Sequence, residues 1–244
     1  MVGITRKPNS PIYLIESNTA DILEFEIGMR LGDYLKYVNT AGDNSLCYEV
    51  KLKGPPQMWK SVLDTITLRS GRVYLGSPCL VDFGHSLATG EFYIINGDVK
   101  RNFDGINEWN FNPLLAKKTT QIELAFRPKP LSLVGIGSIN RISSIWDDEK
   151  KLTAYHEVVV NHTVGDCDMH IIVKVLVLPA DMPENLKGSY IPGSQIGFSG
   201  LVIDSGGSDE NIVIVATLRE TQPTKSKSKS THSQSGFVMH KHKS

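Results

Sequence analysis

The sequence predicts a mostly β protein made of two β-barrel-like halves and a disordered basic C-terminal tail. Three observations lead to this prediction. Turn residues recur at short intervals in the second half, alternate prolines stand near the middle, and the last residues are polar and rich in lysine. β-Branched runs bounded by glycine, proline, asparagine and aspartate are typical of strands. We expect an aromatic-rich β domain over residues 1–130, a small barrel over 131–220, and the tail over 221–244.

The second half has the clearest pattern. Strand-like segments are separated by turn residues, with a long proline-containing connection between the third and the fourth, and they cover residues 131–142, 152–161, 169–178, 195–204 and 211–218. Five short strands at this spacing are typical of a small closed β-barrel. Alternation along the third strand places one apolar row inside the barrel, namely Ile171, Val173, Val175 and Val177.

The first half is less regular. Strands are expected at 72–83, 91–99 and 120–126, although Asn96-Gly97 is also a signal for a tight turn. The boundary between the halves is placed at Arg127-Pro128-Lys129-Pro130, because alternate prolines hold the backbone extended and remove hydrogen-bond donors from a sheet. The two halves could be distant copies of one barrel.

The formal net charge is zero, but the charges are unevenly divided. Residues 221–244 hold five lysines, three histidines and no acidic residue, whereas residues 131–220 hold 12 acidic and 6 basic residues. The tail cannot bury enough apolar surface to offset its ordering entropy, so we expect it to be disordered. Phosphate binding requires positive surface, which the second half lacks.

Known catalytic motifs do not occur in the sequence, so we expect no enzyme activity and no cofactor. Side chains that suit a transition metal surround one hairpin, namely His162, Cys167, Asp168 and His170. Their spacing matches no standard site, so we expect surface residues and no metal. An odd number of widely spaced cysteines favours reduced thiols in the nucleus or cytoplasm. No apolar run has the length of a membrane span, so no membrane contact is expected.

One stretch of the second half carries a family resemblance. It begins with Gly135-Ile136-Gly137-Ser138-Ile139, passes through the hairpin and the proline-containing connection to Gln195-Ile196-Gly197-Phe198-Ser199-Gly200, and ends at Ile212-Val213-Ile214-Val215. This stretch resembles an OB-fold, and most of all the single-stranded DNA-binding domains of the replication protein A type. The resemblance implies a protein that binds single-stranded nucleic acid on the outer face of the second and third strands.

The resemblance and the alternation together give the candidate binding residues. From the barrel they are Arg141, Trp146, Tyr155, His170 and Lys174. Aromatic platforms beside cations are what a single strand requires. The tail is expected to add nonspecific phosphate affinity through Lys225, Lys227, Lys229, Lys241 and Lys243.

The first half is the better electrostatic host if nucleic acid binds the folded body. Most aromatic residues lie there, and most of them must be core. Basic residues stand near some of these aromatics in the sequence: Arg69, Arg72, Lys100 and Arg101 near Tyr74, Phe103 and Trp109.

Two functions remain open on the sequence alone. The first is a non-catalytic single-stranded nucleic-acid-binding protein of OB-fold type with a basic tail. The alternative is a structural or protein-interaction β module, which assembles with itself or with a protein partner and uses the tail for assembly. Positive charge confined to the tail favours the module, and a groove lined by aromatic and basic residues favours nucleic acid.

Overall fold

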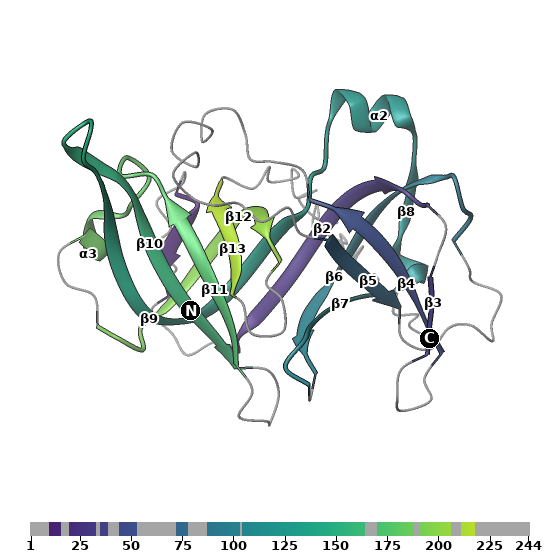
Figure 1. Cartoon of the computed structure of the whole chain (residues 1–244), viewed down its shortest axis with the longest axis horizontal. Coiled ribbons are helices and arrows are strands. Elements are labelled where there is room, and N and C mark those ends of the chain that lie inside the picture. Colours follow the sequence, from purple (N-terminus) through teal and green to yellow (C-terminus); the bar gives the residue numbers. More distant parts are fainter. Residues whose placement is uncertain are drawn as a thin grey trace, which may run out of the picture.

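A computed structural model gives the fold of the chain. The residues that it describes are 10–15, 20–32, 35–38, 44–52, 72–77, 87–102, 104–163, 170–187, 191–205 and 211–217. Within these ranges, thirteen strands join one hydrogen-bonded sheet, which curls into two halves. The two halves lie side by side in Figure 1, with β2 (Ile22–Arg30) and β9 (Ser132–Asp147) running between them.

The second half is a closed five-stranded barrel. Its strands are β9, β10 (Leu152–Thr163), β11 (His170–Val177), β12 (Gln195–Asp204) and β13 (Ile212–Ala216). Four ladders are antiparallel, β11 and β13 pair in parallel, and β12 closes the barrel on β9. The short helix α3 (Glu184–Lys187) lies in the long connection between β11 and β12. The predicted five-stranded barrel is therefore confirmed.

Alternation along β11 places its apolar row in the barrel interior. Ile171, Val173, Val175 and Val177 are all 0% exposed, as predicted. The same interior holds Val158 and Val160 of β10, which pair in register with Val175 and Val173. Each aliphatic side chain buried in this way contributes about 1.5–3 kcal/mol of transfer free energy, so this row stabilises the barrel.

The first half repeats the strand order of the second. Its strands are β2, β4 (Asn44–Lys51), β5 (Arg72–Ser77), β6 (Phe92–Arg101) and β7 (Asn107–Phe111), with β3 (Leu35–Val38) beyond β4 and β8 (Lys117–Thr119) on β6. The order β2-β6-β7-β5-β4 matches β9-β12-β13-β11-β10, including the single parallel pair. In the part of the chain that the structure describes, the halves thus share one strand order, although no ladder between β2 and β4 corresponds to the one between β9 and β10.

Strand pairing joins the two halves directly. β2 pairs with β9 from Ile22 opposite Ile136 to Glu26 opposite Ser132. The strand β1 (Ile12–Leu14) pairs with β12 of the second half. The linker is also fixed, since the Gly28 N–H donates to the Lys129 carbonyl at 2.8 Å. Whether residues 1–130 and 131–220 fold as separate domains stays a prediction.

Two local expectations about the first half are wrong. Residues 121–126, expected in a strand, form the helix α2 (Gln121–Phe126), which follows the 3₁₀ turn η2 (Pro113–Leu115) and β8. Asn96-Gly97, a tight-turn signal, lies inside β6 instead. A side chain at Gly97 would collide with the Asn110 carbonyl, so glycine here permits close strand packing.

No helix among the described residues has the length and apolar character of a bilayer-spanning segment.

Candidate nucleic-acid interface

The outer face of β9, β10 and β11 holds three of the predicted barrel residues. Val159 of β10 pairs with Arg141 on one side and with Lys174 on the other, so these three residues form one row across the strands. His170 begins β11 on the same face, because it is four residues from Lys174. The structure therefore brings Arg141, His170 and Lys174 together on the predicted face.

The cation of Arg141 is already paired. Its Nη2 lies 3.2 Å from Oε1 of Glu157, the neighbouring residue on that outer face. The arginine side chain is exposed, so this ion pair stabilises the fold little. It does offset the positive charge that Arg141 would offer to a phosphate.

Tyr155 does not form the exposed platform that the sequence predicted. Its side chain is 7% exposed and packs with Leu176, Ile203 and Val215 in a second apolar cluster outside the barrel core. Burial raises the pKa of the Tyr155 hydroxyl, and the Glu157 carboxylate adds to this rise. The outer face is thus covered at this corner, and Tyr155 has no open ring face for a base.

Trp146 is exposed, but on a different surface from Arg141. It lies near the end of β9, opposite Thr153, and is 55% exposed. Arg141 and Trp146 are five residues apart in one strand, so their side chains leave opposite faces. Asp147 holds the hairpin tip, since its Oδ1 accepts from the backbone N–H groups of Glu149 and Lys150 at 3.0 Å. Trp146 is therefore a platform on the hairpin, separate from the Arg141 row.

The matching face of the first half is open. Alternate residues of β4 and β5 are buried in its core, namely Tyr48, Val50, Val73 and Leu75. Between the last two, Tyr74 points outward and is 49% exposed. Its strand neighbour across the ladder is Glu49, and the exposed Lys51 pairs with Arg72 two positions along. This face offers an exposed tyrosine ring with Lys51 two positions along the ladder, whereas the outer face of the second barrel carries Lys174 and His170 but buries its tyrosine, Tyr155.

Tyr74 was not among the predicted site residues, although a signal for it exists. It stands between two aliphatic residues that alternation sends inward, so the same alternation sends Tyr74 outward. Trp109, by contrast, is buried, with its ring 5.4 Å from that of Phe25 in an edge-to-face contact. Lys100 pairs with Asp98 at 3.0 Å. Arg69 and Phe103 lie outside the described residues.

The expected surface position of His162 is wrong. Its ring is 1% exposed and meets Phe198 edge to face at 5.5 Å between ring centres. Burial lowers the pKa of His162 to about 4, partly opposed by Asp21 and by the Ile136 backbone. His170 is on the outer face, so the two histidines do not share a site. Cys167 and Asp168 lie outside the described residues.

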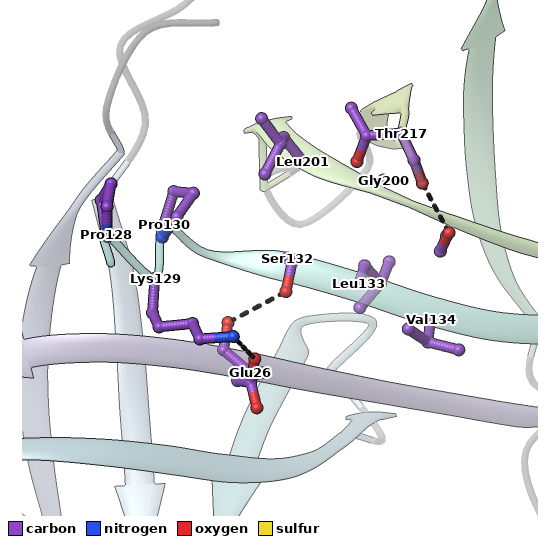
Figure 2. Close-up of a pocket in the computed structure, with 11 residues that line it drawn as sticks. Glu26, Pro128, Lys129, Pro130, Ser132, Leu133, Val134, Gly200, Leu201 and Thr217 are labelled. Carbon is purple, nitrogen blue, oxygen red and sulfur yellow. Dashed lines mark hydrogen bonds and ion pairs between the residues drawn. The ribbon is translucent and has the colours of Figure 1, made fainter. Parts of the chain in front are cut away.

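The junction of the halves holds a small pocket, drawn in Figure 2. Lys129 reaches toward Glu26 there, with 3.5 Å between Nζ and Oε1, and Thr217 of the second half lines the opposite wall. The cavity measures about 160 Å³. Pockets for small ligands are typically about 300–1,000 Å³, so this one is too small to serve as such a site. The predicted tail lysines lie beyond Thr217, outside the described residues.

The architecture defines the class of fold. A five-stranded barrel with strand order 1-2-3-5-4 and a helix between strands three and four is an OB-type barrel. The second half has this arrangement in closed form, and the first half repeats its strand order.

Comparison with known proteins supports this fold. The chain resembles the wild-type single-stranded DNA binding protein from Thermus aquaticus with a TM-score of 0.51 and 12% identity, covering 89% of this chain and 98% of that chain. A deletion mutant of the Thermus protein gives a TM-score of 0.48 and 11% identity, covering 84% of this chain and 97% of that chain. At this identity the likeness concerns the fold. No family model and no curated protein sequence matches the chain.

Proposed function

We propose that this protein binds single-stranded DNA without catalysis. The observation that carries the proposal is the open outer face of β4 and β5, where Tyr74 is 49% exposed on strand three of an OB-type arrangement. In OB-folds this face and the adjoining loops bind oligonucleotides. The fold likeness to a single-stranded DNA binding protein supports the same conclusion.

Each half has a different part in this proposal. Tyr74 stacks on a base, and Lys51 contacts a neighbouring phosphate. The second barrel adds Lys174 and His170 on its outer face and Trp146 on the β9–β10 hairpin. Stacking on an aromatic ring contributes about 1–3 kcal/mol per base and depends little on sequence. Tyr155 is left out, since it is buried.

The charge distribution supports phosphate contacts that lie mostly outside the second barrel. Arg141 is paired with Glu157, and residues 131–220 are acidic overall. Positive charge is available in the tail, whose five lysines we propose as phosphate contacts. We further propose that the protein binds the single strand in the manner of the replication protein A type.

The test is a titration of the full chain with single-stranded and duplex DNA of equal length at fixed salt. Tighter binding to the single strand supports the proposal, because bases in a duplex cannot stack on protein rings. Equal affinity for both would mean attraction to phosphate alone and would reject the stacking site.

A protein-interaction module is the second candidate, and one observation favours it. Leu114 and Leu115 of the η2 turn are 58% and 64% exposed next to each other. Neighbouring exposed leucines are typical of a surface that contacts protein. This candidate predicts self-association or a protein partner, which sedimentation of the wild-type chain across a concentration series would detect.

A further inference from the structure

The helix α2 presents an apolar face to solvent. Ile122 and Phe126 are 68% and 83% exposed, and a separation of four residues places them on the same side of the helix. Figure 1 shows α2 at the outer edge of the first half, above the strands. An aromatic ring so exposed has nothing to stabilise it in the described fold.

Local interactions hold this helix in place. Thr120 and Glu123 form a capping box, in which the Thr120 hydroxyl accepts from the Glu123 N–H at 3.1 Å and the Glu123 carboxylate accepts from the Thr120 N–H at 3.2 Å. On its inner side, Leu124 packs so closely over Gly28 of β2 that a Cβ at Gly28 would lie 2.6 Å from Leu124 Cδ2. The outward direction of Phe126 is therefore fixed by caps and packing.

The segment around Phe126 is basic in sequence. Residues 113–130 contain four basic residues and one acidic residue, in contrast to the acidic second half. Two of the lysines form ion pairs, Lys118 with Glu91 and Lys129 with Glu26. Lys117 and Arg127 are exposed on either side of α2. An anionic occupant with flat apolar groups matches this combination.

We infer that α2 is an additional contact for single-stranded DNA, outside the β-strand faces. A base stacks on Phe126 while Arg127 and Lys117 contact the flanking phosphates. This inference rests on the proposed function, since it extends the path of the same strand. Charge complementarity favours nucleic acid over an apolar protein surface, because a stacked base and its phosphates satisfy both the ring and the cations.

The experiment compares Phe126→Ala, Phe126→Trp and the wild-type chain on short and long oligothymidylate. An OB-fold occupies roughly 4–16 nucleotides, so a short strand of about 8 fills one barrel face and a long one of about 40 extends beyond it. Phe126→Ala should weaken binding of the long strand by roughly 5- to 100-fold, since loss of one stack has that effect. It should leave the affinity for the short strand unchanged. Phe126→Trp should retain wild-type affinity and show additional fluorescence quenching by the long strand.

Leu115→Ala is the matched control, since it removes another exposed apolar side chain from the same half. It should bind both strands as the wild type does. Equal binding of the long strand by Phe126→Ala and wild type would overturn the inference while leaving the proposed function intact. A change in sedimentation without a change in DNA affinity would assign the face to protein contact and overturn it as well. Failure of the wild-type chain to prefer single strands would reject the proposed function itself.

Discussion

Tyr13 lies directly across Gly197 in the ladder between β1 and β12. Its ring occupies the space that a side chain at position 197 would need, since a Cβ there would lie 2.3 Å from Tyr13 Cζ. The neighbouring Ile12 is 0% exposed in the same ladder. The strand β1 is thus packed on the second barrel.

Gly197→Ala should destabilise the protein by about 1–3 kcal/mol, because the added methyl group displaces the Tyr13 ring. Tyr13→Ala in the same chain should recover part of this loss, since it removes the atoms that collide. Urea unfolding of the two single variants and the double variant measures the coupling. Strictly additive losses would show that the two residues do not touch.

Gly97→Ala should be more damaging, with a loss of about 3 kcal/mol or more. Its Cβ would meet the backbone carbonyl of Asn110 at 1.9 Å, and the backbone of the paired strand β7 cannot move aside as a side chain can. Gly32→Ala is the control, since nothing lies within 4 Å of the Cβ that it adds. Thermal unfolding of both variants checks this, and similar melting temperatures would argue against the β6–β7 pairing.

His162 should make the stability of the protein depend on pH. Burial lowers its pKa to about 4 in the folded state, against about 6.5 when unfolded. Between these values the unfolded chain binds a proton that the folded chain does not. The free energy of unfolding is therefore highest above pH 6.5. It falls by up to about 3 kcal/mol as the pH decreases toward 4.

Urea unfolding at pH 7.5 and at pH 5 measures this effect. His162→Leu should have a smaller loss of stability between the two pH values than the wild type. His170→Gln, which changes an exposed histidine, should lose as much as the wild type. An unchanged pH dependence in His162→Leu would show that another group is responsible.

Alternation predicted the interior of the second barrel because an inward row must be apolar. It could not predict whether an outward residue is exposed, and Tyr155 shows why. Tyr155 does lie on the outer side, but a second apolar cluster with Leu176, Ile203 and Val215 buries it. Strand direction is a local property, whereas the contacts that cover a face come from residues distant in sequence.

The helix α2 was misread although its signal is local. A strand was expected because 120–126 includes apolar and β-branched residues, but Thr120 followed three residues later by Glu123 is a capping box.

The position of His162, in contrast, has no local signal in the sequence. A polar residue beside a turn favours a surface position, and only the register opposite Ile171 places its ring inside the barrel.

Removal of residues 221–244 should flatten the salt dependence of single-strand binding. Up to five lysines can release counterions, so the tail's part of the slope of log affinity against log salt is no more negative than about −3.5, at about −0.7 per phosphate on single strands. The preference for single strands over duplex should survive, since stacking is nearly independent of salt. Loss of all binding in the shortened chain would show that the tail acts alone as a polycation.

The most direct test of the account is the single-strand affinity of Tyr74→Ala and Tyr74→Phe beside the wild type. Tyr74→Ala should weaken binding by about 1–3 kcal/mol through loss of one stack, with an unchanged salt slope and unchanged unfolding. Tyr74→Phe should bind as the wild type does, because it keeps the ring. Wild-type affinity in Tyr74→Ala would contradict the claim that the open face of β4 and β5 holds the strand.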